Sequence, residues 1–292
     1  MLKKLLKCKF HLRFVINPYM RYKADNLGTY SGIVETKREV PIILSLTSYE
    51  ERFNDLVISL YSLLNQTVKP DKIILWLSDD FKSLNDLPYD ITKFIKNGLE
   101  IRFVKDIGSY TKAIYAFKEF KNSIIVTADD DIYYPKDWLA KLYYSYITNP
   151  NDINVHRAHR VKFDGTQIAP YETWTKQIEE ENARFDNFLT GVGGVLYPPN
   201  CFSKEVLRDD IFLTKCQYAD DIWLWVMALV HNRKIRVVKN HQANLYCTNI
   251  FRQIFENQRT LYRINSRGQN DKQLENLLKF YKQNIYPKLH LL

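Results

Sequence analysis

The 292-residue sequence contains only nine glycines and four cysteines, and their placement excludes several classes of site. It has no Gly-rich phosphate loop and no GxGxxG segment, so neither a P-loop nor a dinucleotide-binding fingerprint is indicated. The cysteines, Cys8, Cys201, Cys216 and Cys247, form no CxxC pair and no zinc-ligand spacing. We therefore expect free, reduced thiols, as in a cytoplasmic protein, and neither a zinc site nor a disulfide framework.

Acidic residues are absent from the first 23 positions and scarce after position 231. Residues 1–23 carry seven basic side chains, residues 24–231 carry 23 basic and 30 acidic ones, and residues 232–292 carry 12 basic and three acidic ones. A nucleic-acid-binding protein is expected to carry a basic face through its folded body, whereas this body is acidic and only its ends are basic. We therefore expect no nucleic-acid partner.

The basic N-terminus interleaves leucine and phenylalanine with lysine and arginine over residues 1–14 (MLKKLLKCKFHLRF). This pattern is typical of an interfacial helix on anionic lipid, and the segment is too short and too charged to span a bilayer. The alternative is an ordinary basic leader packed on the domain. On the first interpretation the protein is cytoplasmic, with peripheral contact to the inner face of the cell membrane.

Short apolar runs that alternate with helical patterns predict an α/β fold. The strand candidates are residues 40–47 (VPIILSLT), 72–78 (KIILWLS), 100–104, 123–128 (SIIVTA) and 235–238, and apolar residues from Phe53 to Leu64 recur at helical spacing. Strands that alternate with helices imply right-handed crossovers and a mainly parallel sheet flanked by helices. With 46% hydrophobic residues the chain can bury a large core, which we expect in a single domain.

Three consecutive carboxylates, Asp129, Asp130 and Asp131, directly follow the run SIIVTA. A buried parallel strand opens at its carboxyl end onto the edge where α/β sheets bind ligands. Adjacent like charges repel one another, and a hard divalent cation with oxygen ligands relieves that repulsion. The sequence thus predicts Mn²⁺ or Mg²⁺ holding a diphosphate. The alternative is an acidic turn in which one aspartate caps a helix that begins near Pro135.

A second acidic pair, Asp220 and Asp221, precedes an apolar run at residues 222–230 that is long enough for a buried helix. An aspartate at the start of a helix satisfies free N–H groups and the helix dipole, so Asp220 is expected as the N-cap. Two adjacent acids exceed what a cap needs.

Five segments together resemble a known family in their order and spacing: ILSLTSYEERF, LYSLLNQTVKPDKIILWLS, DIGSYTKAI, TADDDIYYP and ADDIWLW. Over about residues 40–238 the chain resembles bacterial glycosyltransferases of the GT-A fold, similar to family 2 enzymes, of the kind encoded in capsule and lipopolysaccharide loci. The resemblance implies a GT-A (Rossmann-like) catalytic domain at residues 40–240, with its nucleotide-sugar half at 40–135 and its acceptor half at 136–240. Residues 1–39 then form a basic leader and residues 241–292 a basic extension.

The resemblance also assigns roles to both acidic clusters. In such families an Asp-x-Asp element binds the metal and the sugar nucleotide, which places the metal on Asp131 and Asp129 and puts Asp130 in the nucleotide site. In the inverting members an acidic pair supplies the catalytic base, so the match implies that Asp221 or Asp220 accepts the proton of the acceptor hydroxyl. We favour Asp221.

Five further residues are candidates for the donor site. Thr47, Ser48 and Arg52 follow the first strand, where the hydroxyls would meet base or ribose and the guanidinium would meet the diphosphate. Arg52 has the alternative of a solvated residue in a first helical turn. Asp106 is a candidate for base or ribose, and Lys112 for a phosphate or the donor sugar. The alternative for Lys112 is a surface lysine.

The densest glycine cluster lies at residues 191–199 (GVGGVLYPP) and has two open interpretations. Glycine lets the backbone come close to a ligand, so Gly193 and Gly194 are candidates for a floor beneath the transferred sugar. The segment is equally typical of a strand with a bulge and a turn at the proline pair.

The predicted function is a metal-dependent, inverting transfer of a hexose from a nucleoside diphosphate sugar, here a UDP-sugar, to a hydroxyl of a glycan or lipid-linked glycan. Two alternatives remain. A sugar nucleotidyltransferase uses a related fold, but it would normally carry a glycine-rich basic loop after the first strand, and residues 45–52 contain no glycine. A non-catalytic glycan-binding assembly protein would keep the aromatic surface and would not need the acids.

Overall fold

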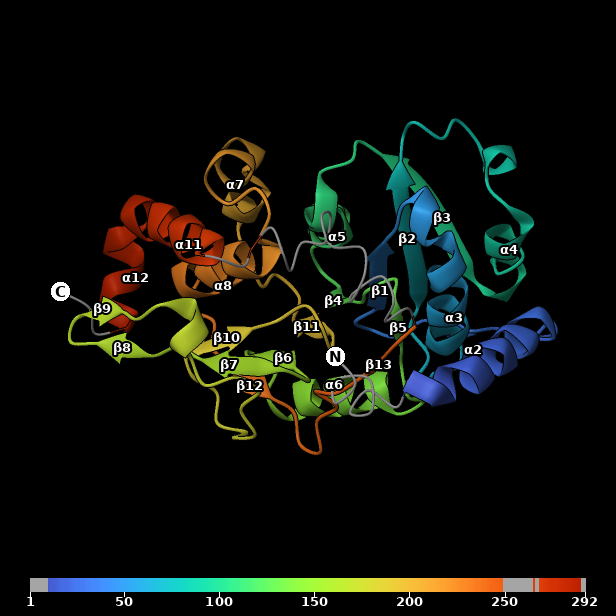
Figure 1. Ribbon diagram of the computed structural model, residues 1–292, viewed down its shortest axis with the longest axis horizontal. Helices are drawn as coiled ribbons and strands as arrows, with labels where there is room; N and C mark the ends of the chain where they lie inside the picture. The colour runs from blue at the N-terminus through green and yellow to red at the C-terminus, as the bar shows by residue number, and fades with distance from the viewer. Residues whose placement is uncertain (1–9, 249–264, 266–267, 290–292) are drawn as a thin grey trace.

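The computed structural model describes residues 10–248, 265 and 268–289, and its largest element is a seven-stranded mixed sheet (Figure 1). The strand order is β12-β6-β11-β4-β1-β2-β3. The strands are β1 (Ile42–Thr47), β2 (Lys72–Ser78), β3 (Leu99–Val104), β4 (Ile124–Thr127), β6 (Ile153–Val155), β11 (Val195–Tyr197) and β12 (Ile235–Val237). β11 is antiparallel to both of its neighbours, and the other pairs are parallel. The predicted mainly parallel α/β sheet is confirmed.

The central strands are buried on both faces because their apolar side chains alternate between two cores. In β2, Ile73, Leu75 and Leu77 belong to one core, whereas Ile74 and Trp76 belong to the other. The first core contains α3 (Phe53–Leu64) and α6 (Trp138–Thr148), and the second contains α5 (Thr111–Glu119) and α8 (Asp220–Val230). The sheet therefore lies between two helical layers, as Figure 1 shows for α3 and α5.

The remaining elements are short and lie around this sheet. Three strand pairs are antiparallel: β5 (Ile132–Tyr133) with β13 (Tyr246–Cys247), β7 (Ala158–Arg160) with β10 (Asn187–Leu189), and β8 (Phe163–Asp164) with β9 (Gln167–Ile168). The other α-helices are α2 (Phe10–Asp25), α4 (Tyr89–Thr92), α7 (Asp209–Lys215), α11 (Gln269–Phe280) and α12 (Lys282–Leu289). The 3-10 helices are η1 (Glu50–Arg52), η2 (Leu84–Asp86), η3 (Ile95–Asn97), η4 (Gly108–Tyr110), η5 (Tyr171–Thr173) and η6 (Lys204–Leu207).

Both ends of the described chain contain helices that pack on the sheet layers. α2 packs against α3, and α11 and α12 pack against α8. Leu277, Ile285 and Tyr281, which lies between the two C-terminal helices, belong to the same hydrophobic core as α8. The predicted interfacial helix at residues 1–14 falls largely outside the described residues. None of the helices described has both the length and the apolar character needed to cross a membrane.

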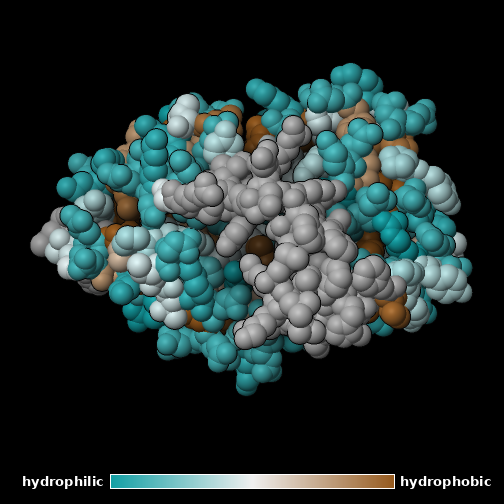
Figure 2. All heavy atoms as spheres, in the orientation of Figure 1, coloured by the Kyte–Doolittle hydropathy of each residue, from teal (hydrophilic) through white to brown (hydrophobic). Residues whose placement is uncertain are grey.

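The surface of the described residues is mainly hydrophilic on the side seen in Figure 2, with small separate hydrophobic patches. Three of the cysteines, Cys201, Cys216 and Cys247, are described, and all three are buried and free.

Candidate active site

A cavity of about 890 Å³ opens beside the carboxyl ends of β1 and β4, where the strand order reverses. A reversal of this kind is where open α/β sheets bind their ligands. The cavity is lined by almost all of the residues selected from the sequence: Thr47, Ser48, Arg52, Asp106, Lys112, Asp129, Asp130, Asp131, Asp220 and Asp221. Both acidic clusters therefore lie on one cavity.

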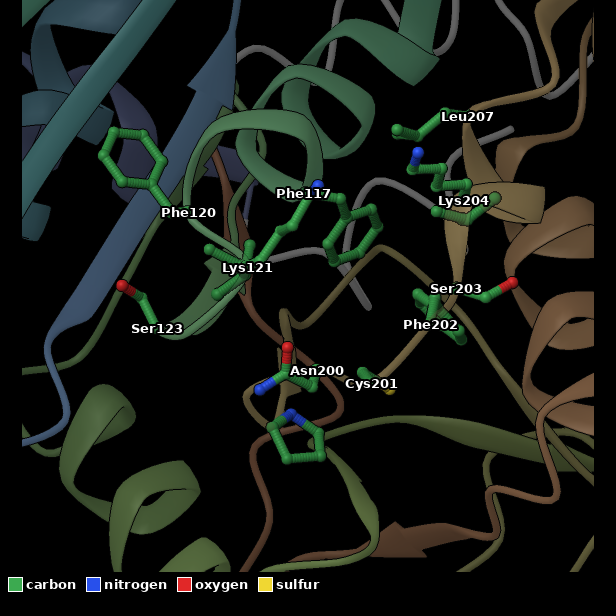
Figure 3. Close-up of a pocket in the computed structure, with 13 residues that line it drawn as sticks. Phe117, Phe120, Lys121, Ser123, Asn200, Cys201, Phe202, Ser203, Lys204 and Leu207 are labelled. Atoms are coloured by element: carbon green, nitrogen blue, oxygen red, sulfur yellow. The ribbon is translucent and has the colours of Figure 1, made fainter.

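A second, smaller cavity of about 320 Å³ lies near the start of β4 (Figure 3). Its wall is formed by aromatic side chains, among them Phe117 and Phe202, together with Lys121 and Lys204. Its described lining includes no carboxylate and none of the residues selected from the sequence. The candidate acid–base and metal-binding residues therefore line the larger cavity and not this one.

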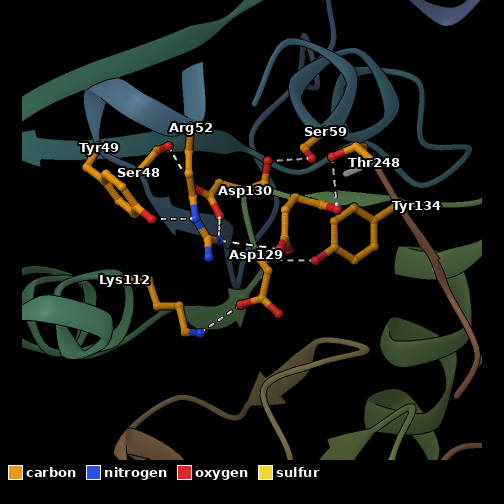
Figure 4. Close-up of polar contacts among 10 residues, drawn as sticks. Ser48, Tyr49, Arg52, Ser59, Lys112, Asp129, Asp130, Tyr134 and Thr248 are labelled. Atoms are coloured by element: carbon orange, nitrogen blue, oxygen red, sulfur yellow. Dashed lines mark hydrogen bonds and ion pairs between the residues drawn. The ribbon is translucent and has the colours of Figure 1, made fainter. Parts of the chain in front are cut away.

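Asp130 is a buried anchor within the larger cavity (Figure 4). Ser48 Oγ donates a hydrogen bond to Asp130 Oδ2 at 2.6 Å, and Arg52 Nη1 lies 2.8 Å from Oδ1. Ser59 Oγ donates to the backbone oxygen of Asp130 at 2.8 Å. Burial opposes the charged form of Arg52, but the charges of Asp130 and Asp131 outweigh this effect and raise its pKa. The positive charge of Arg52 is thus held by these two carboxylates. Ser48 and Arg52 thus fix the acidic turn.

Lys112 connects the two acidic clusters from the N-terminal part of α5. Its Nζ lies 2.8 Å from Asp129 Oδ1 and 3.5 Å from Asp220 Oδ2, and its side chain is 11% exposed. Burial opposes its charge, but the carboxylates of Asp129, Asp220 and Asp221 raise its pKa well above the ordinary value. The alternative interpretation of Lys112 as a surface lysine is therefore wrong.

Asp131 is the carboxylate of the triplet with the weakest pairing. Its Oδ2 lies 3.4 Å from Arg52 Nη1, and its backbone oxygen accepts a hydrogen bond from Thr248 N at 2.7 Å. Burial and the charge of Asp130 raise the pKa of Asp131 to about 7, so another cation near this side chain would stabilise its charged form.

The donor set at this turn fits a hard divalent ion. The described residues contain no group of three or more metal-ligating side chains. Mg²⁺, however, is usually held by one or two carboxylates together with waters and substrate phosphates. Asp129 and Asp131 could supply those carboxylates. The alternative that one of the triplet caps the next helix is wrong, because α6 begins at Trp138 with Asp137 at the N-cap position.

The prediction that Asp220 caps α8 is wrong. The helix begins at Asp220 itself, the N-cap position is occupied by Ala219, and no side chain caps it. The Asp220 side chain is instead turned toward Lys112, and its buried Oδ2 has no hydrogen-bond partner among the described residues. Negative charge in the first turn still interacts favourably with the helix dipole, which helps α8 to carry two acids there.

Asp221 is held at one carboxylate oxygen by the backbone of the glycine-rich segment. Gly191 N donates to Asp221 Oδ1 at 2.8 Å. A Cβ atom at Gly191 would lie 3.0 Å from that oxygen and 3.3 Å from Lys112 Nζ, so glycine permits this close approach. Burial and the charge of Asp220 raise the pKa of Asp221 to about 8. Gly191 is a site residue that the sequence analysis did not select.

Gly193 and Gly194 are not among the residues that line the cavity, whereas Gly191, Val192 and the preceding Thr190 are. Both residues have positive φ, +108° and +91°, a backbone region that favours glycine. A Cβ atom at Gly194 would lie 2.2 Å from the Trp138 ring, so this position requires glycine for packing. The strand interpretation holds further along the segment, where β11 forms.

Thr47 and Asp106 lie on the cavity wall but make local contacts. Thr47 Oγ1 donates to the carbonyl of Trp76 at 2.9 Å, and Asp106 Oδ1 accepts from Gly108 N at 2.8 Å in an Asx-type turn. These contacts fix the ends of β1 and β3 where they border the cavity.

The β7–β10 wall consists of six lining residues that the sequence analysis missed: Arg157, His159, Tyr171, Glu172, Lys176 and Phe188. Arg157 directly precedes β7, His159 lies in β7 and Phe188 in β10, and the other three come from the chain between these strands, which includes η5. His159 is buried, and its Nδ1 accepts a hydrogen bond from Gln177 N at 3.0 Å. Burial and the charge of Arg157 lower the pKa of His159 to about 4, so the ring is neutral and carries its proton on Nε2. The histidine and arginine of HRAHR were the only sequence signal for this wall.

Comparison with known proteins identifies the family. The chain matches Glycosyl transferase family 2 over residues 46–208, which is more than half of its length. None of the curated proteins matches it. Similar solved structures include the mannosyltransferase PcManGT from Pyrobaculum calidifontis in complex with GDP-Man and Mn²⁺ (15% identity, TM-score 0.33, covering 53% of this chain and 47% of that chain). Another is S. aureus TarS 1–349 (13% identity, TM-score 0.46, covering 85% and 73%).

The chain thus spans less than half of the PcManGT chain, and the family assignment rests on the sequence match together with the sheet described above. This protein belongs to glycosyl transferase family 2 and has the mainly parallel α/β sheet of the GT-A fold.

Proposed function

We propose that this chain transfers a hexose from a UDP-sugar to a hydroxyl of a surface glycan or lipid-linked glycan, with inversion at the anomeric carbon. The observation that carries the proposal is the convergence of the two acidic clusters on one cavity, with Lys112 between Asp129 and Asp220. One cluster suits the donor diphosphate, and the other suits the attacking hydroxyl. Family 2 membership supports the nucleotide-sugar donor.

Asp131 and Asp129 would hold Mn²⁺ or Mg²⁺ in this proposal. When bound, such an ion neutralises the negative charge that develops on the departing diphosphate. Asp130 keeps the turn in place through Ser48 and Arg52. The Lys112 ammonium provides a further donor for an anionic leaving group, at a position fixed by its contact with Asp129.

Asp221 would act as the general base. Gly191 N holds Oδ1, which leaves Oδ2 for the acceptor hydroxyl, and a pKa of about 8 lies close to the pH at which a base operates well. Asp220 would keep that pKa high through its own charge and would bind Lys112. Direct in-line attack then needs no covalent intermediate.

We further propose the division of the chain that the sequence suggested. Residues 40–135 would bind the donor, residues 136–240 the acceptor, and residues 1–39 would contact the membrane surface in a cytoplasmic enzyme of capsule or lipopolysaccharide synthesis. The basic extension at residues 241–292 would support the acceptor half. Asp271 Oδ1 of α11 accepts a hydrogen bond from Tyr171 N at 2.7 Å, and Gln273 Oε1 accepts one from Tyr218 N at 2.9 Å.

The test is a panel of UDP- and GDP-sugars incubated with the full chain and Mn²⁺, with phosphate products separated by chromatography. The proposal expects release of UDP, and loss of that release in EDTA. Pyrophosphate exchange would instead identify a nucleotidyltransferase. No product from any donor, with sugars still bound, would support the glycan-binding alternative.

A further inference from the structure

Arg157 is a partly buried cation in the lining of the larger cavity. It lies between β6 and β7 and lines the cavity. No ion pair of Arg157 occurs among the described residues, and its buried Nε has no hydrogen-bond acceptor there. The two other cations discussed above differ, since Arg52 and Lys112 each lie 2.8 Å from a carboxylate oxygen. An unpaired buried donor is costly unless a ligand satisfies it.

The backbone around Arg157 is held in place. The Arg157 carbonyl accepts hydrogen bonds from Thr190 N at 3.3 Å and from Thr190 Oγ1 at 3.2 Å. A Cβ atom at Gly193 would lie 3.3 Å from the Arg157 Cβ, so this glycine lets the two segments pack closely. The position of Arg157 at the cavity is therefore built into the fold on both sides.

Two further donors line the same wall. Lys176 Nζ lies 3.5 Å from the centre of the Tyr171 ring and donates to the Tyr171 carbonyl at 2.6 Å. His159 accepts at Nδ1, which leaves its Nε2–H as a neutral donor. Burial lowers the pKa of Arg157, and the charges of Asp221 and Asp129 act in the opposite direction, although neither carboxylate forms an ion pair with Arg157. Arg157 and Lys176 thus carry two positive charges that form no ion pair among the described residues.

We infer that Arg157, assisted by Lys176 and the Nε2–H of His159, binds an anionic group of the acceptor, a carboxylate or a phosphate. This inference rests on the proposed function, because it uses the division of the cavity into donor and acceptor sides. The donor diphosphate is a less suitable partner for Arg157, since Lys112 and the proposed metal would already bind the diphosphate at the first acidic cluster. A planar guanidinium, by contrast, matches a carboxylate or phosphate with two parallel hydrogen bonds.

The experiment measures anion binding to the full chain with its donor site saturated by UDP and Mn²⁺. The probes are glucuronate, inorganic phosphate and, as the neutral comparison, glucose, each titrated by isothermal titration calorimetry. The inference expects at least one anion to bind, with glucose much weaker, and binding by Arg157→Gln reduced about tenfold or more. Glucuronate alone would indicate a uronic acid in the acceptor, and phosphate alone a phosphate-bearing acceptor.

Matched variants keep the outcome interpretable. Arg184→Gln removes an exposed arginine that is paired with Asp186, and it should bind the anions as the wild type does. Lys176→Gln, at an exposed position, should weaken binding by about threefold and serves if Arg157→Gln fails to fold. Anion binding that Arg157→Gln leaves unchanged, or no binding of either anion, would overturn the inference.

UDP affinity separates this inference from the proposed function. Calorimetry of UDP with Mn²⁺ should give the same affinity for wild type and Arg157→Gln. A large loss in the variant would assign Arg157 to the donor diphosphate and overturn the acceptor assignment. If the wild type itself binds no UDP, the proposed function fails, and anion titrations without UDP still report on Arg157.

Discussion

Replacing Gly191 by alanine tests whether Asp221 is positioned as the structure indicates. The backbone φ at Gly191 lies outside the positive region, so alanine introduces no backbone strain, and the disturbance is confined to side-chain contacts. The new Cβ atom would stand 3.0 Å from Asp221 Oδ1 and 3.3 Å from Lys112 Nζ, closer than ordinary van der Waals contact. The carboxylate must move by a few tenths of an ångström, which weakens its 2.8 Å hydrogen bond from Gly191 N.

The magnitude follows from that hydrogen bond. A hydrogen bond to a charged group contributes about 1.5–3 kcal/mol, and each 1.36 kcal/mol of barrier corresponds to about tenfold in rate. Turnover of Gly191→Ala should therefore fall by about 10- to 100-fold, while UDP affinity and the melting temperature stay close to those of the wild type. The assay is UDP release together with calorimetry of UDP binding.

Gly165→Ala is the contrasting variant. Gly165 has a φ of +58° and no neighbour within 4 Å of the Cβ position, so its replacement should cost about 1 kcal/mol of stability and leave turnover unchanged. Full turnover by Gly191→Ala would refute the proposed positioning of Asp221. So would a drop in UDP affinity as large as the drop in turnover.

Three further predictions follow from the charges of the site. Asp131→Asn should abolish metal-dependent transfer and weaken Mn²⁺ binding measured by calorimetry. The melting temperature should not fall, because the structure already disfavours the charged form of Asp131 and raises its pKa to about 7. Activity of this variant after EDTA treatment would exclude the metal role. The ascending limb of kcat/KM against pH should follow the ionisation of Asp221, whose pKa is raised to about 8 by burial and by the charge of Asp220. Asp220→Asn removes that charge and should move the limb to lower pH. A limb that does not move would mean that another group titrates. Binding to anionic vesicles should weaken with added salt and on removal of residues 1–9, because each of their four lysines contributes on the order of 1 kcal/mol near a charged surface. A truncated chain that binds equally well would exclude residues 1–9 as the anchor.

The sheet and its ligand-binding edge could be predicted because their signals are local. The run KIILWLS became β2 with its predicted bounds, and the alternation of its side chains separates the two cores. The acids directly after β4 could be placed at the cavity because the carboxyl ends of parallel strands share one edge. Helix starts were less accurate, and α6 begins three residues after Pro135.

The β7–β10 wall of the cavity could not be predicted because its residues share no local sequence pattern. Arg157 and Lys176 lie outside the helices and strands, and only tertiary packing brings them together. The glycine cluster shows the same limit. Sequence alone could not distinguish Gly191, which faces the site, from Gly194, which makes room for Trp138.

The most direct test of the account is the rate of UDP release from its donor by Asp221→Asn. This variant keeps the shape of the side chain and removes the proton acceptor, so turnover should fall by about a hundredfold or more while UDP and Mn²⁺ still bind. Glu275→Gln, which changes an exposed acid paired with Lys279 on α11, is the control and should turn over normally. Wild-type turnover by Asp221→Asn, with the donor still bound, would contradict the assignment of Asp221 as the base of this glycosyltransferase.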